Sequence, residues 1–185
     1  MDYELFYAHL FRPIEKLIGP FDPATIMAII GFDCGGPLSF RTVGGVREQF
    51  VTYVSCELAV STGQKCGDTG PFEVMMSCDD QKWAMNMLTK FGRMSFQEIF
   101  EDGHTVDIGE IVGPHCPLQG LVVEEFARIL IEGRNYGILR LHGVTRAELE
   151  FAMKAGVKRL IENLKEAGIY PRTSIQRKHS IGLGA

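Results

Sequence analysis

The chain has 185 residues and a net charge of −4 at pH 7, with 45% hydrophobic and 23% charged residues. These are ordinary globular values, and the length suits one domain spanning residues 1–185, because domains usually contain about 100–200 residues. The acidic balance argues against a nucleic-acid-binding protein, which normally carries a concentrated basic surface. A basic cluster near the C-terminus comprises Arg172, Arg177, Lys178 and His179, and the glycine-rich end of the chain indicates a solvated tail over residues 171–185.

The cysteines and the apolar runs indicate the cellular compartment of the protein. Five cysteines at wide, irregular spacing do not form a disulfide framework. Charged residues interrupt the first part of the chain, so the sequence shows no signal peptide. No apolar run approaches the roughly 20 residues of a membrane span. We therefore expect a cytoplasmic protein that does not enter a membrane.

The first half of the chain predicts one helix and several strands. Apolar residues recur at helical spacing over residues 3–18, which predicts a helix that Pro13 kinks or divides. Short apolar or alternating runs predict strands over residues 25–30, 38–43, 50–60 and 72–77. The polar, glycine-rich residues 61–70 are expected to form the loop of a long hairpin.

The second half predicts helices on either side of a strand-rich stretch. Asp79 or Asp80 is a good N-cap for a helix that runs to about residue 91. The apolar stripe of this helix contains Trp83, which we expect to pack in the core. Predicted strands cover residues 105–108, 121–124 and 137–141.

A capping box gives the clearest local signal. In Thr145-Arg146-Ala147-Glu148, the threonine side chain accepts from the amide of Glu148, whose side chain bonds back to the threonine amide. Apolar residues at helical spacing follow, with Gly156 as a dividing point and Gly168 as the C-terminal cap. Strands bracketed by helices imply an α+β fold, with a mixed, mostly antiparallel sheet packed against helices.

The stretch Gly103 to Glu110 holds a histidine and acids between glycines, as a catalytic loop would. His104 and Asp107 lie in a β-branched segment, and positions three apart in a regular strand face opposite sides of it. No G-x-S-x-G elbow provides a nucleophile. We predict no catalytic site and expect His104 and Asp107 to fix a turn and a strand start by hydrogen bonding. A small hydrolase that uses this pair is the alternative.

Metal and cofactor sites are not indicated by the sequence. His115-Cys116 follows the same stretch, but adjacent ligands rarely converge on one ion, and the spacing typical of a structural zinc site is missing. The glycine-rich turns at residues 33–36 and 43–46 do not continue into a nucleotide-binding motif. We expect no cofactor and no metal. A metal-dependent enzyme built on His104, Asp107 and His115 is a further alternative.

The middle of the chain is rich in acidic residues. A run of charges is usually a solvated face of the protein. The functional alternative is a surface that steers a basic partner protein into contact. The residues that we single out as candidates for such a surface are Asp79, Asp80, Glu101, Asp102 and Glu110.

Several segments resemble one known family, in the same order along the chain. Residues 38–44 resemble a strand that ends in a Thr-x-Gly turn, residues 54–58 the next strand with its Glu-Leu pair, and residues 83–91 the helix that follows. Residues 100–108 resemble a Gly-His-x-Ile-Asp stretch that falls on Gly103, His104 and Asp107, and residues 142–152 a helix start with Thr145 and Glu148. Over residues 37–168 the chain is thus similar to the suppressor of fused family (SUFU), in particular its compact bacterial members.

The resemblance implies an α/β sandwich without known catalysis that acts by binding another protein. The animal protein of this family sequesters zinc-finger transcription factors of Hedgehog signalling, and its bacterial relatives are regarded as immunity proteins that neutralise polymorphic toxins. The segments that hold the animal protein's ligand have no match here, and the chain has no room for that protein's second domain. The predicted function is therefore a non-enzymatic protein-binding domain, an immunity-type inhibitor of a toxin. A scaffold or oligomerisation module is another alternative.

Overall fold

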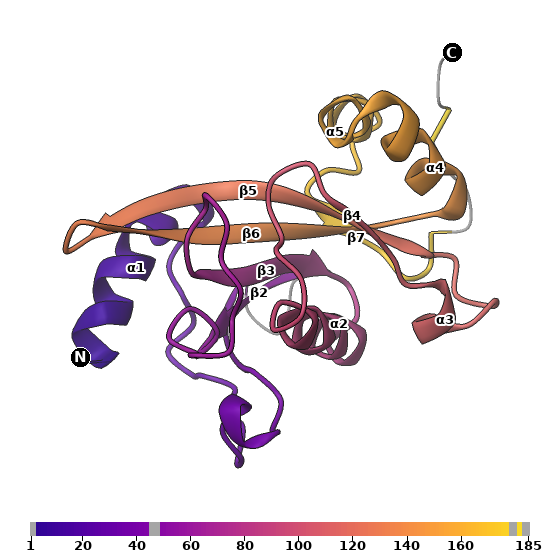
Figure 1. Cartoon of the computed structure of the whole chain (residues 1–185). Helices are drawn as coiled ribbons and strands as arrows, with labels where there is room; N and C mark the ends of the chain where they lie inside the picture. Colours follow the sequence, from indigo (N-terminus) through magenta and orange to yellow (C-terminus); the bar gives the residue numbers. More distant parts are fainter. Residues whose placement is uncertain (1–2, 45–48, 178–180, 183–185) are drawn as a thin grey trace.

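The computed structural model describes residues 3–44, 49–177 and 181–182. A seven-stranded mixed sheet carries helices on both faces (Figure 1), which confirms the predicted α+β fold. The strands are β1 (Ser39–Val43), β2 (Val51–Cys56), β3 (Phe72–Cys78), β4 (Thr105–Asp107), β5 (Gly120–Ile131), β6 (Arg134–Val144) and β7 (Arg172–Thr173). The helices are α1 (Tyr3–Ile18), α2 (Gln81–Met94), α3 (Gly109–Val112), α4 (Arg146–Ala155) and α5 (Val157–Glu166), with a 3₁₀ turn η1 (Phe32–Cys34).

The sheet joins two antiparallel halves through one parallel pair. The strand order is β1-β2-β3-β6-β5-β4, with β7 beside β3. Neighbours are antiparallel from β1 to β3 and from β6 to β4, whereas β3 runs parallel to both β6 and β7. β5 and β6 form a long hairpin that projects at one end of the molecule (Figure 1). The sheet is therefore mixed and mostly antiparallel, as predicted.

Helix α2 covers one face of the sheet. Asp80, one of the two predicted N-caps, accepts a hydrogen bond from the Trp83 amide at 2.7 Å. Leu88 and Phe91 of the helix share a core cluster with Val74 of β3, and the Trp83 side chain packs against this cluster. The predicted helix, its cap and the core position of Trp83 are confirmed.

Helix α1 and the α4–α5 pair pack on the opposite face, at its two ends. Leu10 and Ile14 of α1 pack with Met75 of β3, whereas Leu160 of α5 belongs to a separate cluster on β5 and β6. The register pairs Met75 with Arg140 of β6. Because paired residues of neighbouring strands share a face, the strip between the two helix groups carries polar side chains of β5 and β6.

The predicted strand over residues 25–30 is wrong. Within this segment only Ile26 pairs, through an isolated bridge to Phe40 of β1. Met27, Ile29 and Ile30 are exposed. The prediction took an apolar run to be buried, whereas here the run forms a loop at the edge of the sheet.

The remaining elements agree with the sequence in kind and differ in length. α1 is one helix that continues through Pro13, so the proline does not divide it. β2 ends at Cys56 because Glu57 has a φ of 95°, a left-handed conformation that a regular strand cannot contain. β5 and β6 are longer than their predicted strands, and Gly156 separates α4 from α5 as predicted. No helix within the described ranges is long and apolar enough to cross a membrane.

The segment after α5 is not a solvated tail over the residues that the structure describes up to position 177. Residues 172–173 form β7 against β3, and the Arg177 side chain is only 12% exposed. The prediction is therefore wrong for this part, because it was drawn from the glycine-rich end of the chain, whereas the charge of Arg177 is paired inside the fold. Lys178 and His179 lie outside the described residues, as do residues 45 and 46 of the predicted glycine-rich turn.

Candidate functional site

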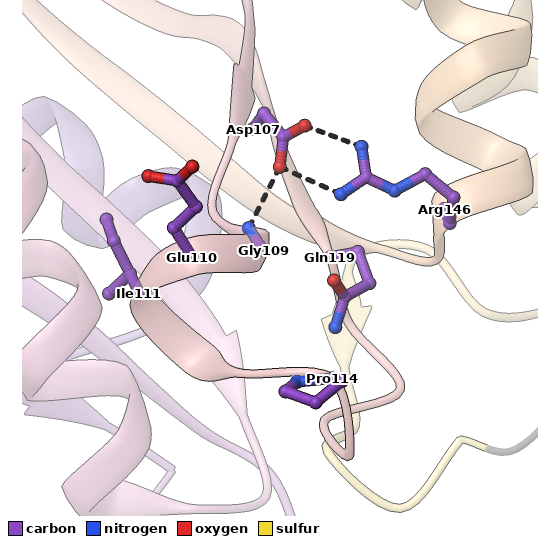
Figure 2. Close-up of a pocket in the computed structure, with 7 residues that line it drawn as sticks. All are labelled: Asp107, Gly109, Glu110, Ile111, Pro114, Gln119 and Arg146. Atoms are coloured by element: carbon purple, nitrogen blue, oxygen red, sulfur yellow. Dashed lines mark hydrogen bonds and ion pairs between the residues drawn. The ribbon is translucent and has the colours of Figure 1, made fainter.

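The end of the stretch Gly103 to Glu110 lines a surface hollow with Asp107, Gly109 and Glu110, and Arg146 in the first turn of α4 lies across from them (Figure 2). Asp107, at the end of β4, accepts two hydrogen bonds from Arg146, from Nη1 to Oδ2 at 2.5 Å and from Nη2 to Oδ1 at 2.9 Å. The Gly109 amide donates to the same carboxylate at 2.9 Å. These hydrogen bonds hold the pKa of Asp107 below its ordinary value, and those from Arg146 have the largest effect. Asp107 thus stays ionised and accepts a bond from the turn into α3.

His104 lies apart from this arrangement. Its backbone closes the turn into β4, since its amide donates to the Glu101 carbonyl at 3.3 Å and its carbonyl accepts from the Val123 amide at 2.9 Å. Its side chain is exposed and makes no hydrogen bond with the described residues. The expected stabilising role therefore falls to the backbone, and the structure does not assemble a His104–Asp107 relay. Among the described residues, no three histidine, cysteine or acidic side chains converge as metal ligands would.

Replacing His104 with alanine is expected to leave the midpoint of urea unfolding unchanged, because the imidazole makes no bond to lose. A control is Val106→Ala, which shortens a buried side chain of β4, the strand that follows His104, and is expected to cost about 2 kcal/mol. A His104→Ala variant as unstable as the control would show that the imidazole itself supports the turn.

The predicted capping box at the start of α4 is present and is part of a larger buried network. Thr145 Oγ1 accepts from the Glu148 amide at 3.4 Å, and Glu148 Oε2 accepts from the Thr145 amide at 2.9 Å. The Glu148 side chain is 0% exposed, and Arg177 donates to it at 2.6 Å. The Ile181 amide also donates to Glu148, at 3.1 Å. One carboxylate therefore caps α4 and ties the segment after β7 to this helix.

Most of the acidic residues singled out in the sequence bond to their own chain. Asp79 accepts from the Ser174 hydroxyl and the Ile175 amide, and Asp80 caps α2. Glu101 accepts from the Asp68 amide at 2.7 Å, and Asp102 from the Glu125 amide at 2.9 Å. Glu110 is exposed beside the hollow of Figure 2. Their role as a partner surface stays a prediction, and the four carboxylates that accept these bonds are held in place by their own chain.

A buried polar cluster on the strip between α1 and α5 is not visible in the sequence. His142 bonds to Glu124 Oε2 at 3.0 Å, and Tyr170 donates to the same carboxylate at 3.2 Å. Arg140 donates to the Tyr170 hydroxyl at 2.5 Å and lies 4.0 Å over the Phe126 ring. Burial lowers the pKa of His142, so the imidazole is neutral at pH 7. Arg140 and His142 lie on β6, Glu124 on β5 and Tyr170 in the loop after α5, and only the fold brings these three segments together.

A second buried cluster surrounds Glu73 of β3, whose side chain is 0% exposed. Its oxygens accept from the hydroxyls of Tyr7 at 2.8 Å and Ser55 at 2.5 Å. They also accept from the amides of Leu58 at 3.3 Å and Ala59 at 2.9 Å. Burial raises the pKa of Glu73 to about 7, although the hydrogen bonds by themselves would lower it. A lone carboxylate in an otherwise apolar strand is the sequence signal that could have drawn attention to it.

The family model of the suppressor of fused protein (SUFU) matches residues 38–178. The chain belongs to the suppressor of fused family. The match confirms the resemblance over residues 37–168 and extends it through β7 to Arg177. The SUFU segment therefore includes the pairing of Arg177 with Glu148, the Glu73 cluster except Tyr7, and the Asp107–Arg146 pair.

The SUFU fold is also seen in solved structures. A chain in the crystal structure of the Sufu–Fu complex has a TM-score of 0.70 and 17% identity, with 96% of this chain and 91% of that chain covered. The crystal structure of Drosophila Suppressor of Fused has a TM-score of 0.69 and 18% identity, with 95% of this chain covered. The chain spans 50% of the length of that Drosophila chain. No curated protein sequence matches significantly. At these identities the likeness shows the fold.

Proposed function

We propose that the chain is a non-enzymatic protein-binding domain. The observation that carries the proposal is the likeness of its fold, over 96% of its length, to a chain solved in a complex named for two proteins, Sufu and Fu. The site geometry supports it, because Asp107 pairs with Arg146 and not with His104. A hydrolase built on these two residues lacks the base–orienter contact that such chemistry needs.

We further propose that the bound protein is a toxin, which the chain neutralises in the cytoplasm as an immunity-type inhibitor. The resemblance to compact bacterial SUFU members supports this role. The net charge of −4 favours encounter with a basic partner, because complementary charge raises the rate of association. Inhibition is steric: the inhibitor covers the working surface of the toxin and supplies no catalytic group.

Co-expression with the products of neighbouring genes tests the proposal. We expect one such product to stop the growth of a bacterial host when expressed alone and to be tolerated when this chain is present. The two proteins should also elute as one complex in size-exclusion chromatography. The proposal fails if no neighbouring product is both toxic and neutralised. Light scattering of the chain alone would then identify the scaffold alternative, since a scaffold or oligomerisation module forms a defined oligomer without a partner.

A further inference from the structure

A hollow of about 300 Å³ lies at β7, and we refer to it as the β7 hollow. Two arginines line it, Arg172 of β7 and Arg177 of the segment that follows, together with the apolar side chains of Phe50 and Ile169. No carboxylate is among the described residues of its lining. The β7 hollow is therefore a basic site on a chain whose net charge is −4.

The positive charge of the β7 hollow comes from Arg172. Its guanidinium lies 5.2 Å from the centre of the Phe50 ring. Its side chain has no carboxylate partner among the residues that the structure describes. Stacking on a ring orients a guanidinium and leaves its edges, which carry the N–H donors, available to an anion. Arg172 is thus an exposed cation that an aromatic ring holds beside the hollow.

Arg177 contributes hydrogen-bond donors to the hollow, whereas its charge is already paired. Its Nη2 donates to Glu148 at 2.6 Å and to the Gly143 carbonyl at 3.2 Å. Its Nε and Nη1 are buried and have no hydrogen-bond partner among the described residues. Such donors are rare in native proteins, because a buried N–H that water cannot reach costs free energy while it stays unbonded. Arg177 therefore has donor capacity that a bound anion would satisfy.

Two carboxylates bond to residues that line the hollow but do not line it themselves. Glu148, which is 0% exposed, accepts from Arg177. Asp79 accepts from the hydroxyl of Ser174, which lines the hollow. An anion that enters the hollow therefore meets the charge of Arg172 without a described carboxylate beside it in the lining.

We propose that the β7 hollow binds a phosphate group, with Arg172 as the cation and the side chains of Arg177 and Gln176 as further hydrogen-bond donors. Arginine binds phosphate through paired, charge-assisted N–H···O bonds. A phosphate has three acceptor oxygens in a tetrahedral arrangement, so it accepts from donors that approach from different sides. The apolar side chains of Phe50 and Ile169 give the organic part of a small phosphate ester a surface to pack against. The phosphate site is independent of the proposed protein-binding function.

NMR titration of the full chain with inorganic phosphate, at constant ionic strength, tests the site. We expect saturable shifts at the backbone amides of residues 168–177, and acetate should bind there at least tenfold more weakly. Arg172→Gln should weaken phosphate binding at least tenfold. Arg134→Gln is the matched control, because Arg134 is also an exposed arginine beside an aromatic ring, 5.6 Å from that of Tyr136, and does not line the hollow. The control should bind phosphate like the wild type.

Gln176→Glu is a second variant, which adds a carboxylate to the hollow at an exposed position, so it reports on the site even if Arg172→Gln unfolds. It should bind phosphate at least tenfold more weakly than the wild type. Glycerol phosphate in a parallel titration identifies the source of the group: tighter binding than inorganic phosphate indicates an ester, and equal or weaker binding indicates the free ion. The site is overturned if phosphate causes no saturable shifts at these amides, if acetate binds as tightly, or if both variants bind phosphate as the Arg134→Gln control does.

Discussion

Glutamine in place of Glu73 is expected to lower the free energy of unfolding by about 3 kcal/mol at pH 5. The carboxyl group is the shared acceptor for two hydroxyls and for the backbone amides of Leu58 and Ala59. A protonated carboxyl keeps lone pairs on both oxygens, whereas the amide nitrogen of glutamine cannot accept a hydrogen bond. The substitution therefore leaves one buried backbone N–H facing another donor.

Urea unfolding followed by the fluorescence of Trp83, the one tryptophan of the chain, measures this effect. Glu162→Gln is the control, since Glu162 is an exposed residue of α5 and should unfold like the wild type. A Glu73→Gln variant as stable as the wild type at pH 5 would show that the donors around Glu73 have other acceptors and that the network does not support the fold.

The stability gap between wild type and Glu73→Gln is expected to depend on pH. Burial raises the pKa of Glu73 to about 7 from an ordinary value of 4.5. When folding raises the pKa of a group, protonation of that group stabilises the folded protein. This stabilisation is complete below the pKa in the unfolded chain and is lost as the pH rises through the pKa in the folded protein. The gap should therefore narrow by about 2 kcal/mol between pH 5 and pH 8. The titration of His142 is common to both proteins and cancels. A gap that widens with pH would contradict the raised pKa.

Methionine in place of Arg177 is expected to lower the free energy of unfolding by about 3 kcal/mol at pH 7, because it leaves the Glu148 carboxylate buried without its cation. Glu148 is 0% exposed and Arg177 is 12% exposed, so water cannot replace the lost partner. In the sequence Arg177 is one of several basic residues near the C-terminus. In the structure its guanidinium pairs with the carboxylate of Glu148, the residue that caps α4. Urea unfolding measures the change.

Arg146→Met is the control for this prediction, since Arg146 also pairs with a carboxylate, that of Asp107, but both side chains of this pair are exposed. We expect the control to unfold close to the wild type, because exposed ion pairs are screened by water. The double variant Glu148→Gln with Arg177→Met should recover part of the loss, as removal of both charges leaves neither unpaired. If Arg177→Met unfolded like Arg146→Met, the segment after β7 would be the solvated tail that composition indicates.

The candidate site could be predicted from sequence only as far as its bonds are local. The Thr145–Glu148 box and the Asp80 cap join residues three apart, and their patterns are visible in any window of the sequence. Asp107 was expected to fix a turn from its place in the sequence, but its partner Arg146 lies 39 positions away. His104 was grouped with Asp107 by proximity in sequence, and the fold separates their side chains by giving Asp107 another partner.

The sequence by itself determined the α+β class, the longer helices and most strands, because amphipathic periodicity, caps and glycine stops act within a few residues. Only the tertiary structure decided which polar groups are buried together and which apolar groups stay outside. Tyr7 reaches Glu73 across 66 positions, and Ser174 reaches Asp79 across 95. Contacts at such separations leave no periodic pattern. The apolar run at residues 25–30 likewise could not be told from a buried strand, because the hydrogen bonds that join Ala28 to Ser39 and Phe32 to Glu57 and Arg93 are not local.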